Sequence, residues 1–170
     1  MSEINVFYYK TKIGELIIGS YENKLCLLDF RWRRMRTTVD NRIKKELQAE
    51  FVEKETKLII KTKKQIDEYL EGKRKKFDIP LLTVGTDFQK QVWKELMNIP
   101  YGQTVSYLDL ANKINNPKAV RAVASANGAN AISVIIPCHR VINSNGELGG
   151  YGGGLAVKKR LLKIEKENGK

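Results

Sequence analysis

The sequence predicts an α+β protein of two domains, and three patterns along the chain support this class. Residues 4–30 alternate apolar and polar side chains between short turn signals, which is typical of a small antiparallel sheet. Residues 57–71 repeat apolar side chains with the period of a helix, and residues 106–127 form two helical segments joined by a tight turn. We therefore expect an N-terminal α/β domain over residues 1–80 and a mainly helical C-terminal domain over residues 81–170.

Three strands and two helices are expected in the first domain. Cys26 falls in the third strand and is a core residue, and Gly72 ends the second helix. The strands cover residues 5–9, 15–18 and 24–28, the helices cover residues 40–54 and 57–71, and residues 77–82 form an extended connector. One stripe of the second helix carries Leu58, Ile59, Ile66, Tyr69 and Leu70.

The second domain opens with a capping box, Thr86-Asp87-Phe88-Gln89, which predicts a helix ending near Pro100. The inward side chains of this helix are Phe88, Val92, Leu96 and Ile99. Ser106 caps a second helix over residues 107–114, whose apolar positions are Leu108, Ala111 and Ile114.

A third helix is expected over residues 118–127, with Pro117 at its first position and Gly128 at its end. Together with the second helix it makes a helix-turn-helix, the pattern of many DNA-binding proteins. Lys118 and Arg121 are its only long side chains, whereas a helix that reads bases in the major groove needs several. The other side chains are small or medium: Ala119, Val120, Ala122, Val123, Ala124, Ser125 and Ala126.

Such a slim helix can approach a narrower groove closely, while one arginine reaches between the bases and the helix amides meet phosphate. It would then bind the shape and backbone of DNA, nearly without regard to sequence. The alternative is an alanine-rich helix packed against a neighbour.

Composition and charge narrow the class of protein further. The chain is 42% hydrophobic and 29% charged, and its apolar stretches are too short to span a membrane. The N-terminus lacks a basic segment followed by an apolar run, so we expect no secretory signal. Two distant cysteines predict no disulfide framework and fit a reducing cytoplasm.

The formal net charge of +12 is spread over both halves of the chain. This excess fits a polyanionic partner, nucleic acid before membrane, although lysine can also serve solubility or stability in hot environments. Residues 31–36, Arg-Trp-Arg-Arg-Met-Arg, are open to the same two interpretations. They contact nucleic acid, or they form a solvated loop around one packed tryptophan.

The sequence Pro137-Cys138-His139 is the candidate reactive stretch. Residues 132–136 are apolar and β-branched, which predicts a short buried strand-like segment leading to Cys138. Only a thiolate attacks, and His139 is the sole imidazole that can take the proton. Neighbouring side chains in extended backbone point to opposite faces, so a bridging water is the easier geometry. The plain alternative is a buried thiol beside a surface imidazole.

No metal or cofactor is expected. One histidine and two cysteines cannot supply the four ligands of a structural zinc site. The glycine cluster at residues 149–154 lacks the spacing of a dinucleotide-binding turn. It fits a loop that closes over a flat base, or a plain flexible linker.

The second half of the chain resembles the O6-alkylguanine-DNA alkyltransferases, also called methylated-DNA–protein-cysteine methyltransferases. The resemblance centres on Pro137-Cys138-His139-Arg140-Val141 and runs in family order over residues 85–165. The first half is similar mainly in layout, which implies a ribonuclease H-like arrangement, and in residues 72–81. The other matching segments are Gly85–Gln89, Val92-Trp93, Ile99–Gly102, Ser106-Tyr107, Asn116–Val123, Asn130, Tyr151, Gly153-Gly154, Lys158 and Glu165.

The resemblance implies a reaction and the residues that perform it. Cys138 would take an alkyl group from O6 of guanine in a single irreversible turnover, with His139 as base and Glu165 orienting it. Asn130 would hold the turn before the reactive strand. Tyr107 would help to rotate the nucleotide out and would donate a proton toward the leaving guanine.

Further residues would hold the DNA and the flipped base. Arg121 would fill the gap in the duplex, and the same helix would face DNA with Lys118, Ala119, Ala122 and Ser125. The guanine pocket would be lined by Val141, Tyr151, Gly152, Gly153 and Lys158. Many relatives carry a hydroxyl side chain where Gly152 stands, so the contact to O6 is the least defined. The alkyl groups accepted, activity on O4-alkylthymine and cooperativity on DNA stay open.

Two other functions fit parts of the sequence. A cysteine hydrolase using Cys138, His139 and Glu165 would leave the helix-turn-helix without a purpose. A non-catalytic protein that binds alkylated DNA would lack the cysteine, which is present here. For an alkyltransferase we expect double-stranded DNA as partner, no membrane, a monomer in solution and a cytoplasmic location, nucleoid-associated in a prokaryote.

Overall fold

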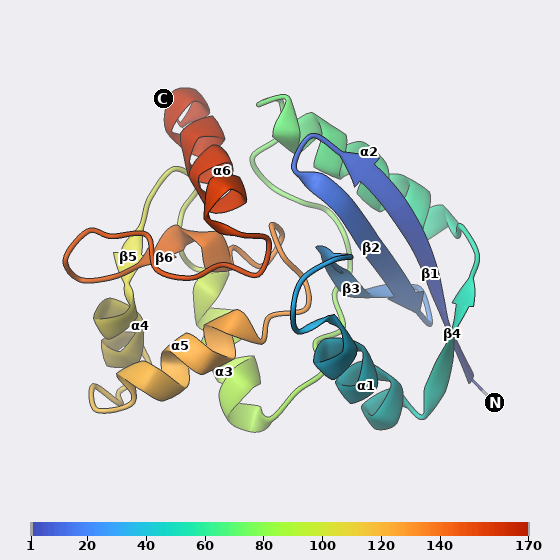
Figure 1. Cartoon of the computed structure of the whole chain (residues 1–170), viewed down its shortest axis with the longest axis horizontal. Helices are drawn as coiled ribbons and strands as arrows, with labels where there is room; N and C mark the ends of the chain where they lie inside the picture. The colour runs from blue at the N-terminus through green and yellow to red at the C-terminus, as the bar shows by residue number, and fades with distance from the viewer. Residues whose placement is uncertain (1, 170) are drawn as a thin grey trace. The chain divides into compact units, whose positions relative to one another are not determined.

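The computed structural model describes residues 2–169, which form two compact units, one up to Gly85 and one from Thr86 onward (Figure 1). Each unit has its own secondary structure and its own buried side chains. The predicted division after residue 80 stays a prediction, because compactness alone does not show which segments fold independently.

The first unit is built on a four-stranded sheet with strand order β3-β2-β1-β4 (Figure 1). The predicted meander is antiparallel and consists of β1 (Ser2–Thr11), β2 (Gly14–Tyr21) and β3 (Lys24–Phe30). Glu22 and Asn23 turn between β2 and β3 with φ of 49° and 63°, the positive values that a tight hairpin requires. The prediction that Cys26 is a core residue is confirmed, since it is 1% exposed.

The prediction of one helix over residues 40–54 is wrong. The helix is α1 (Arg36–Leu47), which ends at Gln48 in a left-handed conformation with φ of 50°. The chain then enters β4 (Ala49–Glu53), which pairs with β1 in parallel. The sheet is therefore mixed, and pairing with β1 outweighs the helical tendency of this short segment.

The second helix, α2 (Lys57–Leu70), agrees with its prediction and packs against β1, β2 and β3. Thr56 caps it by accepting a hydrogen bond from the backbone N–H of Ile59. The extended connector has a second role that the sequence did not reveal. Leu25 of β3 donates to the Pro80 carbonyl and accepts from the Leu82 amide, both at 2.8 Å, so the connector covers the edge of the sheet.

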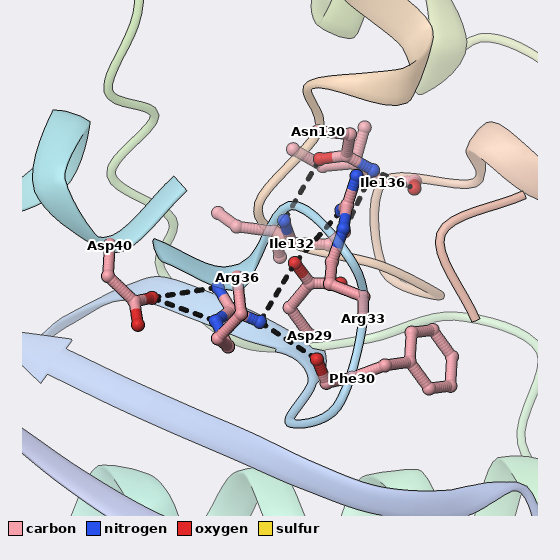
Figure 2. Close-up of polar contacts among 8 residues, drawn as sticks. All are labelled: Asp29, Phe30, Arg33, Arg36, Asp40, Asn130, Ile132 and Ile136. Carbon is pink, nitrogen blue, oxygen red and sulfur yellow. Dashed lines mark hydrogen bonds and ion pairs between the residues drawn. The ribbon is translucent and has the colours of Figure 1, made fainter. Parts of the chain in front are cut away.

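Two arginines of the segment at residues 31–36, Arg33 and Arg36, pair with carboxylates (Figure 2). Asp29 is fully buried and pairs with Arg33 at 3.0 Å and with Arg36 at 3.1 Å. Arg36 also contacts Asp40 at 2.9 Å. The expectation of a packed tryptophan is wrong, because Trp32 is 76% exposed. Contact of this loop with nucleic acid stays a prediction.

The second unit is mainly helical. Its first helix, α3 (Asp87–Leu96), carries the predicted capping box between Thr86 and Gln89. The next helix, α4 (Tyr107–Lys113), begins with a second capping box, between Ser106 and Asp109. The prediction for Leu108 is wrong, because α3 and α5 cover the side of α4 that carries Leu110, and Leu108 is 42% exposed.

The third helix, α5 (Val120–Gly128), starts two residues later than predicted, because Pro117 and Lys118 form a turn before it. Its packing face carries Val123, Ala126 and Asn127, against α3 and α4. Trp93 of α3 fixes the helix by donating its indole N–H to the Ala126 carbonyl at 2.8 Å. The helices α4 and α5 thus form the predicted helix-turn-helix pair.

The rest of the unit surrounds the reactive stretch. A short 3₁₀ helix, η1 (Cys138–Arg140), leads into β6 (Val141–Ile142), which pairs in parallel with β5 (Val105–Ser106). The chain ends with α6 (Leu155–Asn168), which packs against η1 and to which the sequence assigned no helix. Within residues 2–169, no helix has both the length and the apolar character needed to cross a bilayer.

Candidate active site

The segment from Asn130 to Val141 is buried without interruption. Asn130 is 1% exposed and fixes the start of this segment with its side chain (Figure 2). Its Oδ1 accepts from the Ile132 amide at 3.0 Å, and its Nδ2 donates to the carbonyls of Ile136 at 2.9 Å and Ile132 at 3.3 Å. One amide side chain therefore replaces the backbone pairing that a strand would have provided.

The prediction of a strand-like segment over residues 132–136 is wrong, although the segment is buried as expected. The chain makes consecutive turns there, and Val134 has φ of 71°, a value that β-branched residues rarely adopt. Alternation of apolar residues cannot distinguish a buried strand from a buried turn whose hydrogen bonds come from a distant side chain.

Replacing Asn130 with alanine is expected to lower the free energy of unfolding by about 3 kcal/mol, because the buried Ile132 amide loses its acceptor and the carbonyls of Ile132 and Ile136 each lose one of two hydrogen bonds. Urea denaturation measures the loss. Asn98→Ala is the matched control, since Asn98 is exposed and lies at the end of α3, and its effect should stay below about 0.5 kcal/mol. Equal effects of the two substitutions would contradict the bracing role of Asn130.

Cys138 opens the 3₁₀ turn and is 6% exposed. Its N–H donates to the Ile136 carbonyl at 2.8 Å, and its own carbonyl accepts from Asn127 Nδ2 at 3.3 Å. The backbone is turned at this point, so the expectation that the Cys138 and His139 side chains point to opposite faces of an extended chain does not apply.

The imidazole of His139 lies next to the carboxylate of Glu165, with 2.6 Å between Nε2 and Oε2. Both side chains are buried, at 0% and 1% exposure. A carboxylate that is ionised only accepts hydrogen bonds, so Nε2 carries the proton and Nδ1 is the basic nitrogen. Burial lowers the pKa of His139 against the opposing effect of Glu165, which favours a neutral imidazole able to accept a proton.

Glu165 has two further partners. Arg140 donates to Oε1 from Nε at 2.7 Å and to Oε2 from Nη2 at 3.1 Å, and the Gly102 amide donates to Oε1 at 3.2 Å. Burial raises the pKa of Glu165, but the hydrogen bonds from His139 and Arg140 and the charge of Arg140 outweigh it and lower the pKa to about 2. The carboxylate is therefore ionised and fixed in orientation.

Lys158 lies beneath the glycine-rich loop that joins β6 to α6. Its ammonium donates to the carbonyls of Val141 at 2.7 Å, Gly150 at 3.2 Å and Leu148. These bonds tie the loop to β6. Burial lowers the pKa of Lys158 to about 8, and the charge of Cys138 acts in the opposite direction.

Tyr107 is the first residue of α4, and the same loop lies against it. A Cβ on Gly149 would be only 3.3 Å from the Tyr107 hydroxyl, and Gly149 has φ of 73°, so glycine is required there. Burial and then the charge of Cys138 raise the pKa of Tyr107, while a hydrogen bond with Asn127 lowers it. The phenol therefore stays protonated and can act as a donor close to the cysteine.

Comparison with known proteins identifies the family. The sequence model for the ribonuclease-like domain of 6-O-methylguanine DNA methyltransferase matches residues 6–83, and the model for its DNA binding domain matches residues 87–167. A methylated-DNA–protein-cysteine methyltransferase of Methanosarcina barkeri is 42% identical over 159 residues, which cover 94% of this chain and 95% of that protein. The chain belongs to the 6-O-methylguanine DNA methyltransferase family.

Solved structures of this family agree over both units. The crystal structure of Mycobacterium tuberculosis O6-methylguanine methyltransferase has a TM-score of 0.80 and 35% identity, covering 99% of this chain and 94% of that one. The structure of Mycobacterium tuberculosis OGT in complex with DNA has a TM-score of 0.81 and 36% identity, with coverage of 98% and 94%. The α+β class predicted from the sequence is thereby confirmed.

The region that matches the family's DNA binding domain includes α5, which has a buried face and an exposed face. Val123, Ala126 and Asn127 pack inward, whereas Lys118, Arg121, Ala122 and Ser125 are exposed and Ala119 is half-buried. The inward face therefore fits the interpretation of an alanine-rich helix packed against its neighbours, and contact of the outer face with DNA stays a prediction. The side chains next to Arg121 on the outer face are small, so Arg121 projects beyond them.

The residues expected in the pocket come from β6, the loop after it and α6. Val141 is fully buried, Tyr151, Gly152 and Gly153 are half-buried, and Lys158 is fully buried. Their contact with a guanine stays a prediction. In the part of the chain that the structure describes, no three His, Cys, Asp or Glu side chains gather so that they could hold a metal ion.

Three contributors to this methyltransferase site were given no role from the sequence: Arg140, Asn127 and the Gly102 amide. One signal pointed to Arg140, because a cation next to the sole histidine in an apolar stretch needs a carboxylate. Lys158 and Glu165 are seven residues apart, which places both on one face of a helix. The contacts of Asn127 and Gly102 depend on tertiary packing, so no local sequence pattern predicts them.

Proposed function

We propose that this protein repairs alkylated DNA by moving an alkyl group from O6 of guanine to the sulfur of Cys138. The observation that carries the proposal is the buried pair of His139 and Glu165, 2.6 Å apart, directly after Cys138. Family membership and the relative crystallised in complex with DNA support the same function. Double-stranded DNA is the partner, and the protein acts as a monomer.

The proton balance of the reaction needs only side chains of this chain and a bridging water molecule. Nδ1 of His139 takes the thiol proton through a water molecule, and the sulfur attacks the alkyl carbon. The S–C bond forms while the C–O6 bond breaks, Tyr107 gives its proton to the guanine, and His139 returns a proton to Tyr107. The thiol proton thus ends on guanine. A thioether has no easy return path, so each molecule reacts once.

The target base must leave the duplex to reach a cysteine that is 6% exposed and held on a fixed turn. The slim outer face of α5 allows close approach to a groove, and Arg121 occupies the space left by the flipped nucleotide. Tyr107 and the loop at Gly149 then lie beside the extruded base. Such binding is nearly independent of sequence, which suits damage that occurs anywhere.

The test is the stoichiometry of repair. With excess duplex that contains O6-methylguanine, the repaired DNA is expected to reach a plateau at one equivalent of methyl per protein. Continued turnover beyond one equivalent would favour a hydrolase, and the absence of any transfer would favour a protein that only binds alkylated DNA.

Arg121→Ala is expected to slow repair of duplex DNA by about 100-fold, because about 3 kcal/mol of flipped-state stabilisation is lost. Reaction with free O6-benzylguanine should change by less than about twofold, since the free base needs no flipping. Single-turnover kinetics on both substrates measures the two effects. Equal slowing of both would contradict the wedge role.

Binding to undamaged duplex is expected to weaken steeply with salt, because phosphate contacts release counterions. Lys118→Ala should reduce the slope of log K against log salt by about one, while leaving sequence preference unchanged. Fluorescence anisotropy over a salt series measures the slope. A slope near zero for the native chain would show that its positively charged side chains do not contact DNA phosphates.

A further inference from the structure

Arg140 contacts Glu165 more extensively than His139 does, and it enters no step of the reaction above. Its guanidinium bridges both carboxylate oxygens, with Nε to Oε1 at 2.7 Å and Nη2 to Oε2 at 3.1 Å. Nη1 donates to the Ile99 carbonyl at 2.7 Å, and the guanidinium carbon lies 5.6 Å from the centre of the Tyr101 ring. Arg140 is 7% exposed, so these contacts are made away from water.

The contact between Arg140 and Glu165 affects whether the imidazole of His139 is neutral or protonated. A buried carboxylate with a histidine as its only cationic partner draws a proton onto the imidazole and forms a buried ion pair. An imidazolium has no lone pair with which to accept the thiol proton. A guanidinium that stays charged supplies the countercharge of Glu165 itself, and His139 can then remain neutral.

The bridging geometry has a second effect, on orientation. Oε1 accepts from Arg140 and from the Gly102 amide, which leaves Oε2 directed at His139 Nε2. The carboxylate cannot rotate without breaking its three hydrogen bonds to Arg140 and the Gly102 amide. The proton on the imidazole is thereby kept on Nε2, and the basic lone pair on Nδ1.

We propose that Arg140 is a positioning residue that keeps His139 a neutral base, by neutralising Glu165 and fixing the oxygen that the imidazole binds. The inference deepens the proposed function and rests on it for the identity of the base. Lys158 of α6 also acts on His139 and is included in the balance. Cys138 acts on Lys158, and Tyr101 of the loop after α3 is influenced by the charges of Glu165 and Arg140.

The chain has a single histidine, so one ¹⁵N-labelled imidazole reports the site without overlap. In the native protein the nitrogen signals at pH 7 should be those of a neutral ring protonated on Nε2. An imidazolium at pH 7, or a proton on Nδ1, would overturn the proposal without any variant being needed. This measurement does not depend on whether the chain transfers methyl groups.

Arg140→Met removes the countercharge and is expected to raise the midpoint of the His139 titration by at least about one pH unit. The ascending limb of the rate of reaction with O6-benzylguanine should move with it. Arg140→Lys keeps a charge but cannot bridge both oxygens, so its midpoint should stay near the native value while the rate falls about tenfold. A purely structural arginine predicts lower rates with an unchanged midpoint in both variants, and that result would overturn the proposal.

The proposed function and the role of Arg140 can be refuted separately. A native chain that transfers no methyl to Cys138 would refute the proposed function, whatever the state of the imidazole. A native chain that transfers methyl but whose imidazole titrates unchanged in Arg140→Met would refute only the role of Arg140.

Discussion

Replacing Cys138 with serine abolishes alkyl transfer and leaves the affinity for DNA within about twofold of the native value. The serine hydroxyl is far less acidic than the thiol, so His139 cannot produce a nucleophile from it. Serine is close in size to cysteine, and the outer face of α5 is untouched, so binding should persist. Transfer from labelled duplex and fluorescence anisotropy measure the two properties.

The matched control for this substitution is the other cysteine. Cys26 is buried in β3, and burial raises its pKa to about 12, which leaves it unreactive at neutral pH. Cys26→Ala should therefore keep full transfer to Cys138, at a modest cost in stability. Transfer that survives in Cys138→Ser, or that disappears in a folded Cys26→Ala, would remove Cys138 from its assigned role.

Replacing Glu165 with glutamine is expected to have the second largest effect, on rate and on stability together. The neutral amide does not hold the imidazole as a base, and a contribution of about 100-fold to the rate is lost. Arg140 is left as a buried cation without its carboxylate, which costs about 3 to 5 kcal/mol of stability. Single-turnover kinetics and urea denaturation measure the two losses.

The pH dependence of stability follows from the same carboxyl. The pKa of Glu165 is lowered in the folded state from 4.5 to about 2, so the unfolded chain binds its proton first as the pH falls. The stabilisation is complete above pH 4.5 and is lost between that value and about pH 2, amounting to roughly 3 kcal/mol. In Glu165→Gln this part of the acid dependence should be missing. An identical acid profile in both proteins would contradict the ionised pair.

The helix-turn-helix could be predicted from the sequence because its signals are local. Ser106 and Asp109 form a capping box within four residues, and the small residues of α5 show its slim face directly. The meander β1 to β3 was predictable for the same reason, since Asn23 readily adopts the left-handed conformation that the turn requires. Local patterns of this kind need no knowledge of distant partners.

The parts that could not be predicted depend on distant partners. β4 is a strand because β1 is available beside it, and residues 132–136 turn because Asn130 satisfies their backbone. The contacts among Glu165, Arg140 and Gly102 join segments from three places in the sequence, which no periodicity reveals. The resemblance to the alkyltransferase family nevertheless suggested the reactive residues, and their distances and burial indicate which chemical steps each could perform.

The most direct test of the central claim is the mass of the peptide that contains Cys138 after incubation with duplex DNA bearing O6-methylguanine. We expect a peptide in which one methyl group replaces the thiol hydrogen, located at Cys138 by fragmentation. We also expect that the Cys26 peptide is unchanged. An unmodified Cys138 peptide, from protein that has bound the same DNA, would contradict the account.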